Sequence, residues 1–500
     1  MAKTRDYADK RSFDQTPEPE ASVRGNVDPT NAKAGKTFMV HQHHATRLHF
    51  DLRLEMLKGD TPVLASWAVP KNLPRKKGKP HLAIHVEDHP FDYGSFSGTI
   101  PAGNYGAGEV RIFDSGTYEV LEQEAAKLTI RLQGDRLRGV YHLIQTERGK
   151  NKDEWLVFLR EDERPELEPL PALTPMLATL ATEAFDNPAW MFEPKWDGVR
   201  TLAVCGETTK LLSRNNNDMT ATYPELQKLH EQLVALDAVV DGEIVAFEKG
   251  RPSFEKLQSR INLQNARDIE RATKACPVTF IAFDLLYLDG RRVYAQAVEE
   301  RKEMLEKLVV VSPRVQVSTF VLEEGRALSD AAEARGLEGI VAKKLGSSYR
   351  PGKRSKDWLK IKVTHEVDVV VGGWSRGEGS RSTSFGALLV GAYADDALHF
   401  LGSVGTGFSQ KTLDDLMDRL QKVASDECPF VEGEKGIKGG RFGKPVRNPS
   451  WTKPELVAKV EFRELTSAPR LRAPSFKGLR FDKNAEDCLL SELEALRPGG

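Results

Sequence analysis

Strict alternation of apolar and polar residues is the feature that most limits how this chain can fold. Residues 48–56 and 358–363 follow it closely, and residues 239–247 follow it in part, with Asp241 and Glu243 on one face. Successive side chains of a strand point to opposite faces, so each segment predicts a strand with one apolar and one polar face. Gly, Pro and Asn turns separate further short strand-like runs, as in residues 100–120. The pattern favours a multidomain α+β protein that is rich in sheet.

The 500 residues are enough for about three domains of 100–200 residues each. The polar residues 1–36 predict a disordered, mobile tail, and residues 37–160 predict a small domain that resembles a β-barrel. A linker rich in Pro and Glu follows at 161–174. Strands and helices alternate in 175–364, which indicates an α/β domain. Short strands and one helix in 365–500 fit an OB-fold β-barrel.

The charge balance does not exclude a nucleic-acid partner. The chain has 72 Lys plus Arg and 73 Asp plus Glu, for a net charge of −1. Residues 343–362 nevertheless contain eight Lys/Arg and one acid, and residues 435–483 contain thirteen and four. Since net charge sums over segregated regions, a neutral total is compatible with local DNA-binding faces, whose binding would be sensitive to salt.

Targeting and redox signals are absent from the sequence. The N-terminus has no apolar stretch typical of a secretion signal, and no segment approaches the roughly 18 apolar residues of a membrane span. The four cysteines are far apart and form no C-x-x-C pair, which favours reduced thiols over a structural zinc site. We therefore expect no membrane contact and a cytoplasmic, nucleoid-associated protein.

Residues 193–200, with the sequence EPKWDGVR, place Lys195 beside a predicted tight turn at Asp197 and Gly198. A lysine nucleophile must lose its proton, which desolvation and neighbouring cations favour. Arg200 adds a cation whose planar fork suits phosphate. Alone, the octamer fits an ordinary exposed strand and turn equally well.

Other parts of the central domain suit nucleotide chemistry without proving it. Asp241 and Glu243 share one face of a predicted strand, where an acidic pair suits a divalent cation or simply a solvated strand edge. Phe283 lies in a predicted buried strand, where an aromatic residue is ordinarily core. Lys360 and Lys362 lie about 6–7 Å apart on one strand face, which suits a polyphosphate or a solvated surface.

Taken together and in order, these segments closely resemble the motifs of ATP-dependent DNA ligases, in the covalent nucleotidyltransferase superfamily. The matching elements are Lys-x-Asp-Gly at Lys195, SRN at 213–215, the strands of Glu243 and Phe283, EGIVAKK and WLKIK. The resemblance implies that Lys195 becomes bonded to AMP, that Phe283 stacks on adenine, and that Glu243 and Glu338 help to hold Mg²⁺ or Mn²⁺. It also implies that the ATP site is lined by Glu193, Arg200, Arg214, Glu243, Phe283, Lys343, Arg354, Lys360 and Lys362.

Residues 471–483, with the sequence LRAPSFKGLRFDK, resemble the closing OB-domain motif of bacterial repair ligases. By that resemblance the basic residues orient the pyrophosphate leaving group while the barrel clamps duplex DNA. A solvated basic tail is the simpler alternative. The residues concerned are Arg472, Lys477, Arg480 and Lys483.

A second candidate site lies in the first domain. His49, Asp51 and Arg53 share the polar face of a predicted strand, and His43 precedes them in an H-x5-H-x-D pattern. Imidazole and carboxylate suit Mn²⁺ or Zn²⁺, and an adjacent arginine suits a phosphate oxygen. The solvated side of an antiparallel sheet explains the same pattern without a site.

Three segments, HFDLRLE, SWAVPKNLP and VEDHPFDYGSFSGTIPAGNYGAG, resemble the 3′-phosphoesterase domain of bacterial end-joining ligases, which trims 3′-ribonucleotides and 3′-phosphates. The sequence departs from the family at Phe50, where tyrosine is frequent, and at His81, where arginine is common. The glycines of residues 103–108 are interpreted as turns. The resemblance implies that His43, His49 and Asp51 bind Mn²⁺ and that the phosphate is contacted by Arg53, Ser66, Lys71, His89 and Tyr93.

The two resemblances together imply a monomeric ATP-dependent DNA ligase with 3′-end processing, acting on nicked or broken duplex DNA in bacterial non-homologous end joining. Ku and a separate primase-polymerase are the implied partners, and no polymerase domain is expected in this chain. An RNA ligase or capping-type nucleotidyltransferase is the nearest alternative. A DNA 3′-phosphatase with a non-catalytic ligase-like module, and a non-catalytic end-bridging scaffold, are the others.

Overall fold

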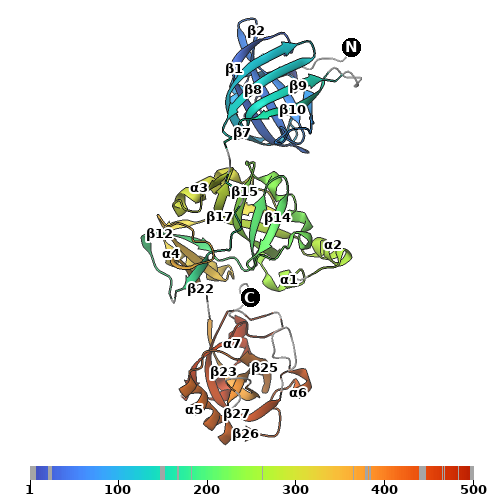
Figure 1. Ribbon diagram of the computed structural model, residues 1–500. Helices are drawn as coiled ribbons and strands as arrows, with labels where there is room; N and C mark the ends of the chain where they lie inside the picture. Colours follow the sequence, from blue (N-terminus) through green and yellow to red (C-terminus); the bar gives the residue numbers. More distant parts are fainter. Residues whose placement is uncertain are drawn as a thin grey trace.

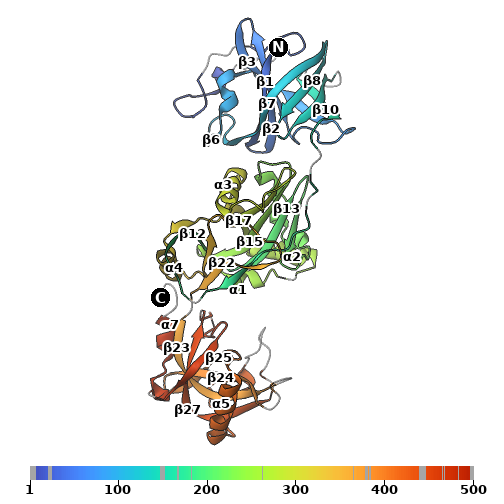
Figure 2. The same ribbon diagram turned by 60° about the vertical axis from the view of Figure 1, so that its left-hand side comes forward.

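The computed structural model contains three bodies that follow one another along the chain (Figures 1 and 2). No helix within the described residues is both long and apolar enough to cross a membrane. The residues that the structure describes are 7–20, 25–146, 153–165, 168–169, 171–181, 183–261, 263–363, 365–377, 381, 384–437, 446, 448–463, 465–466, 468–481 and 483–495.

The first body is a closed barrel, which confirms the predicted barrel-like domain. Its strand order is β1-β2-β3-β4-β10-β9-β8-β7, and β7 pairs back onto β1 to close the ring. The short strands β5 and β6 pair with β3 and β7. The bounds are β1 (Lys33–His44), β2 (Leu48–Lys58), β3 (Thr61–Val69), β4 (His81–His85), β5 (His89–Pro90), β6 (Gly98–Ile100), β7 (Gly108–Glu124), β8 (Lys127–Gly134), β9 (Arg138–Gln145) and β10 (Glu154–Asp162), with the 3-10 helices η1 (Ala8–Lys10) and η2 (Phe91–Ser95).

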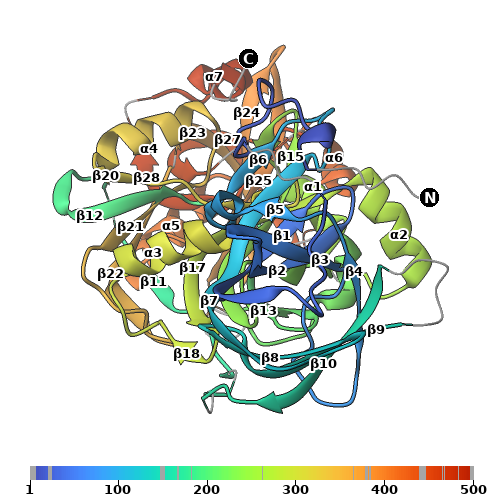
Figure 3. The ribbon, with the colours of Figure 1, turned by 90° about the horizontal axis from the view of Figure 1, so that it is seen from above.

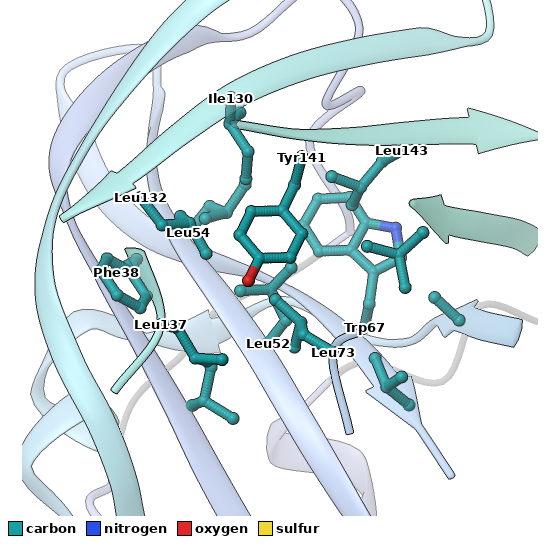
Figure 4. Packing of buried hydrophobic residues seen from close by; sticks show 14 of the residues in the cluster. Phe38, Leu52, Leu54, Trp67, Leu73, Ile130, Leu132, Leu137, Tyr141 and Leu143 are labelled. Carbon is teal, nitrogen blue, oxygen red and sulfur yellow. The ribbon is translucent and has the colours of Figure 1, made fainter. Parts of the chain in front are cut away.

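The barrel interior is filled by the apolar faces of the strands (Figure 4). Leu52 and Leu54 of β2 pack there with Trp67 and Tyr141, all within 2% of full burial. Complete burial of such a side chain contributes roughly 1.5–3 kcal/mol to folding, so the inward face of β2 is strongly specified. The alternation then leaves the polar residues of β2 on its other face.

The prediction of a mobile tail at 1–36 is wrong for the described part of that segment. Tyr7 is fully buried, Lys10 forms an ion pair with Glu87 at 2.8 Å, and Arg11 forms one with Glu18 at 2.7 Å. The polar composition misled because these charges are paired against the barrel instead of being solvated. Residues 1–6 and 21–24 lie outside the described residues.

The second body contains two sheets, as expected for a mixed α/β domain. One has the order β14-β13-β15-β17-β18, with β16 and β19 at its margins, and the other has the order β11-β22-β21-β12-β20. Their bounds are β11 (Leu177–Leu180), β12 (Asn187–Pro194), β13 (Val199–Cys205), β14 (Thr209–Ser213), β15 (Ala238–Glu248), β16 (Arg251–Pro252), β17 (Val278–Leu288), β18 (Arg291–Arg292), β19 (Val315–Val317), β20 (Val321–Glu323), β21 (Gly339–Lys344) and β22 (Arg354–Lys362). The helices are η3 (Thr220–Thr222), η4 (Pro224–Leu226), η5 (Leu229–Gln232), α1 (Phe254–Gln258), α2 (Ala266–Ala275), α3 (Val298–Leu308) and α4 (Gly325–Ala334).

The third body is the predicted OB-fold domain, in which β27 pairs with β23 and β28. The predicted amphipathic helix is α5, which buries Leu413, Leu416 and Leu420. The bounds are β23 (His365–Arg376), β24 (Phe385–Ala394), β25 (Ala397–Val404), β26 (Ala424–Ser425), β27 (Pro449–Phe462), β28 (Ser475–Arg480), α5 (Gln410–Lys422), α6 (Gly433–Gly436), η7 (Ala485–Asp487) and α7 (Leu490–Ala495).

The barrel contacts the second body through apolar and charged side chains. In the view from above, the strands of the barrel lie in front of the other two bodies (Figure 3). Val234, Leu236 and Val310 of the second body belong to the apolar cluster of the barrel. Arg136 of the barrel pairs with Asp289 at 2.6 Å. We call this surface the interdomain contact; it joins the barrel to the second body independently of the connecting segment.

Candidate active sites

A cavity of about 220 Å³ opens between the two sheets of the second body and collects most of the predicted nucleotide-site residues. Met176 and Trp196 also line it, although the sequence patterns did not single them out. Glu338 and Lys362 do not line the cavity. The predicted residues that do are Glu193, Lys195, Arg200, Arg214, Glu243, Phe283, Lys343, Arg354 and Lys360.

Lys195 directly follows β12, whose pairing with β21 holds it at the cavity. Its backbone N–H donates to Gly339 O at 2.8 Å, and its Nζ donates to Glu338 Oε2. The other oxygen of Glu338 binds Arg463 at 2.9 Å, just beyond the end of β27 in the third body. Sequence reasoning missed Arg463, because a single arginine at the end of a strand carries no recognisable signal. Glu338 thus links the candidate nucleophile to the OB-fold domain.

Glu193 lies buried behind the candidate nucleophile. It accepts hydrogen bonds from Lys302 at 2.9 Å and Lys343 at 3.1 Å. Lys343 also donates to Phe283 O at 2.8 Å. Burial lowers the pKa of Lys343, and the charge of Glu193 opposes that effect. This compensated group of charges fixes β12 against β17 and β21.

Arg200 is held in place by protein partners. Its Nε and Nη2 each donate to Asp241 at 2.6 Å, and its guanidinium lies 4.6 Å from the centre of the Phe283 ring. Tyr349 O–H donates to the same Asp241 carboxylate at 2.6 Å, and Met176 N–H donates to Tyr349 Oη at 2.8 Å. The carboxylate of Asp241 is therefore engaged with protein donors and buried, which fits neither the cation-binding pair nor the solvated strand edge that its position in the sequence suggested. Asp241 instead orients Arg200 over Phe283.

Glu243 lies close to the candidate nucleophile. Burial raises its pKa to about 8, while the charges of Arg200 and Lys195 oppose the shift. The negative charge of Glu338 also raises the pKa of Glu243. Carboxylate oxygens are the ligands that Mg²⁺ and Mn²⁺ prefer, so the residue types of Glu243 and Glu338 suit a divalent cation. In this structure the two oxygens of Glu338 pair with Lys195 and Arg463.

The basic residues predicted near the C-terminus divide into two groups. Arg472 reaches the second body, where it pairs with Asp197 at 3.0 Å and lies 4.9 Å from the Phe254 ring centre. The others pair with acids of their own domain: Lys477 with Glu461, Arg480 with Asp368 at 3.0 Å, and Lys483 with Asp368 at 3.6 Å.

On the barrel, His43, His49 and Asp51 form the cluster expected from their spacing. Their potential ligand atoms all lie within 4.8 Å of one another. His43 Nε2 is 2.7 Å from Gly106 O and His49 Nδ1 is 3.0 Å from Arg47 O, so each of these nitrogens donates to a carbonyl. The opposite ring nitrogens, 3.8 and 3.6 Å from Asp51, then present lone pairs toward it. This donor set, oriented by carbonyls behind it, fits a divalent metal.

Arg53 is locked beside this cluster. It donates to Asp51 at 3.0 Å, to Ser66 Oγ at 2.8 Å and to His41 Nδ1 at 3.1 Å, and it lies 4.7 Å from the Tyr93 ring centre. Burial disfavours the charge of Asp51, but Arg53, His43 and His49 outweigh it and lower the pKa of that carboxyl. A fixed guanidinium beside a metal-binding cluster suits a phosphate oxygen.

His89 and Tyr93 border the same site. Their ring centres are 4.7 Å apart, and His89 Nε2 is 3.3 Å from Arg11 Nη2. Burial, followed by the charges of Arg53 and Arg11, lowers the pKa of His89. His41 and Arg11 are thus neighbours of the site that the sequence patterns did not identify.

Lys71 lies elsewhere. It is exposed and lines a cavity with His81 and Phe50, to which His43, His49 and Asp51 do not contribute. Phe50 is half-buried, with its ring 5.2 Å from that of Phe113. The glycine-rich loop of residues 103–108 forms turns as interpreted, and one of its carbonyls holds His43.

Three family models match the chain. Residues 175–362 match the ATP dependent DNA ligase domain, residues 41–145 the DNA Ligase D 3′-phosphoesterase domain, and residues 381–483 the ATP dependent DNA ligase C terminal region. The chain therefore carries, on one polypeptide, the domains of an ATP-dependent DNA ligase and a ligase D 3′-phosphoesterase domain.

The relatives agree with this assignment. The chain is 39% identical, over 96% of its length, to the multifunctional non-homologous end joining DNA repair protein LigD of Mycobacterium tuberculosis, and 32% identical over 99% to LigD of Pseudomonas aeruginosa. It covers 60% and 62% of those relatives, so it spans about three fifths of their length. The solved ligase domain of M. tuberculosis LigD is 35% identical, with 63% of this chain and 98% of that chain covered at a TM-score of 0.36.

Proposed function

We propose that this protein seals breaks with a 5′-phosphate and a 3′-hydroxyl in duplex DNA through a lysyl-AMP intermediate, and that its barrel heals 3′ ends. The observation that carries the proposal is the position of Lys195 in a cavity lined by arginines, lysines and a stacking aromatic ring. Repair of double-strand breaks by non-homologous end joining is the proposed process. We propose that the protein acts as a monomer at the nucleoid, with Ku and a separate primase-polymerase as partners.

The ligase reaction follows from the residues of the cavity. Lys195 Nζ attacks the α-phosphate of ATP, a phosphoramide bond forms, and pyrophosphate leaves. The AMP group then passes to the 5′-phosphate of the break, and the 3′-hydroxyl displaces AMP as the phosphodiester forms. Each step concentrates negative charge at phosphorus, which Arg200, Lys360 and the OB-domain residue Arg472 would offset.

We propose that a divalent metal ion takes part at each of the two sites. Glu243 and Glu338 would hold Mg²⁺ or Mn²⁺ at the ligase site, and His43, His49 and Asp51 would hold Mn²⁺ in the barrel. When bound, such an ion neutralises phosphate charge and orients oxygen ligands. In the barrel, Arg53 would bind a phosphate oxygen from its fixed position between Asp51 and Ser66.

Labelling with α-³²P-ATP and Mg²⁺, followed by a chase with nicked DNA, tests the ligase proposal. Wild-type protein should acquire a label that nicked DNA removes as the nick is sealed, and Lys195→Ala should acquire none. Lys344→Ala, which alters an exposed lysine on β21, serves as the matched control. A label on Lys195→Ala, or no label on the wild type, would contradict the proposal. Transfer to RNA instead of DNA would favour an RNA ligase.

Release of phosphate from a 3′-phosphorylated DNA primer tests the barrel. With Mn²⁺ present we expect His49→Ala to lose at least about a hundredfold in rate, as is typical of lost groups that position metal and substrate. His142→Ala, on the distant strand β9, should keep the wild-type rate. Full activity of His49→Ala would overturn the metal assignment, and a 3′-ribonucleotide substrate tests the second trimming activity.

A further inference from the structure

Two cavities of about 350 Å³ each adjoin one another where the barrel meets the second body. They share Arg75, Gly206 and Glu207. We call them together the interdomain groove. One wall comes from the barrel residues 70–81, and the other comes from the turn at 206–210 and from residues 230–237.

The barrel wall of the groove is strongly basic. Residues 71–81 contain five Lys/Arg and no Asp or Glu. Lys71, Arg75 and Lys76 of this stretch line the groove, and the opposite wall adds exposed Lys210. Lys77 and Lys79 are exposed in the same stretch but do not line either cavity. A concave surface lined by cations focuses a positive potential and attracts polyanions.

The acids of the groove are already engaged. Asp237 binds Arg75, Glu207 pairs with Lys76 at 3.0 Å, and Glu231 pairs with Lys228 at 3.1 Å. The Lys76–Glu207 pair is well exposed on both sides, and such pairs contribute only about 0–1 kcal/mol, so a phosphate can readily displace it.

The walls are held together and connect to the metal-binding strand. Arg75 Nη1 donates to Leu236 O at 2.9 Å in addition to its ion pair with Asp237. Leu48 and Phe50 of β2 line the groove, and they alternate along that strand with His49 and Asp51. The groove therefore lies against strand β2 on the face opposite to the candidate metal ligands, and it extends from there to the surface of the second body.

We propose that the interdomain groove binds the phosphodiester backbone of DNA, as a binding surface additional to the two active sites. The proposal rests on the proposed function in one respect, namely that DNA is the substrate. Lys71 and Lys76 of the barrel and Lys210 of the second body would contact that backbone from the two walls of the groove. Its contacts are ionic and independent of sequence.

The test compares matched pairs of exposed lysines in the full chain. Lys76→Ala/Lys210→Ala removes one cation from each wall. Lys274→Ala/Lys307→Ala removes two cations from α2 and α3, each exposed and paired with a glutamate as Lys76 is. Fluorescence anisotropy with a labelled 3′-phosphorylated duplex, repeated over a range of salt concentrations, gives the affinity and the salt slope for each protein.

We expect the slope of log K against log salt to become shallower by about 0.9 for each lysine that contacts a phosphate, so by about 1–2 for the groove variant, while the control keeps the wild-type slope. An unchanged slope in the groove variant would overturn the proposal. Labelling of Lys195 by ATP, which needs no DNA, is measured in parallel. If Lys195 is labelled normally but the salt slope of the groove variant is unchanged, only the groove proposal is refuted. If the salt slope becomes shallower but Lys195 is not labelled, the ligase proposal is refuted and the groove proposal is supported.

Discussion

At the scale of single residues, the nucleotide cavity depends on groups behind the ones that face it. Asp241 is fully buried, and its carboxylate accepts hydrogen bonds from both Arg200 and Tyr349. Tyr349 in turn accepts from the backbone of Met176, at the rim of the cavity. The position of Arg200 over Phe283 is thus set by a chain of hydrogen bonds that passes through Tyr349 and Asp241, neither of which lines the cavity.

Tyr349→Phe should therefore weaken ATP binding more than chemistry. Loss of one buried hydrogen bond costs roughly 0.5–1.5 kcal/mol, so we expect KM for ATP in the labelling reaction to rise about two- to tenfold. The rate at saturating ATP should change little, because Lys195 keeps its contacts. Tyr393→Phe, in the OB-fold domain, is the control. A fall in the saturating rate with KM unchanged would show that Tyr349 does not act through Arg200.

The sequence predicted these residues unevenly. Nine of the predicted nucleotide-site residues line one cavity, because their positions are tied to recognisable motifs and strand faces. Alternation reveals the face of a strand but not the partner of a side chain on that face, so the sequence did not predict the pairing of Asp241 with Arg200. The sequence did not identify Arg463 and Tyr349 either, because their roles arise from tertiary contacts.

At the scale of elements, strand β2 shows how alternation builds a site. Its apolar face is locked into the barrel core, which forces His49, Asp51 and Arg53 onto the other face. The segment that precedes β1 is a different case, since its order depends on a few anchors. Asp88 is one of them: its carboxylate accepts from Val27 N–H at 2.6 Å while Asn26 accepts from Asp88 N–H at 3.1 Å. No sequence pattern reports such anchors.

Asp88 should make the barrel less stable as the pH rises. Burial raises its pKa to about 7, and the Val27 N–H opposes the shift. A carboxyl whose pKa is raised on folding stabilises the fold fully below its unfolded value of about 3.9, and this contribution is lost as the pH rises through 7. Thermal unfolding should therefore show Tm falling between pH 4 and 7, with a smaller fall in Asp88→Asn. Asp92→Asn, also near η2, should retain the wild-type pH dependence, and identical profiles for Asp88→Asn and the wild type would exclude this role.

At the scale of the whole molecule, two arginines of the OB-fold domain contact the second body near Lys195. Arg463 binds Glu338, which also pairs with Lys195, and Arg472 binds Asp197, two residues after Lys195. The order of the domains was predictable from the sequence, because each carries its own motifs. The contacts between them were not, since they join residues far apart in the chain and outside those motifs.

Arg463→Ala should slow the labelling of Lys195 by ATP. A partly exposed ion pair contributes about 1 kcal/mol, so we expect a fall of roughly fivefold, with partial recovery in Arg463→Lys. Arg419→Ala removes an equivalent charge from α5, where Arg419 pairs with Asp415 of its own helix, and should have no effect. Equal rates for Arg463→Ala and Arg419→Ala would show that the contact with Glu338 does not assist the reaction.

The interdomain contact also affects whether the barrel and the second body would stay together as separate polypeptides. Its Arg136–Asp289 pair is modest, but the connecting segment keeps both surfaces on one chain, where the effective concentration of one for the other is on the order of millimolar. A contact too weak to join free partners can persist under that tether. If the barrel and the rest of the chain are produced as two polypeptides, we therefore expect them to dissociate at micromolar concentration. The covalent connection would then be needed, together with the side-chain contacts, to hold the barrel on the second body.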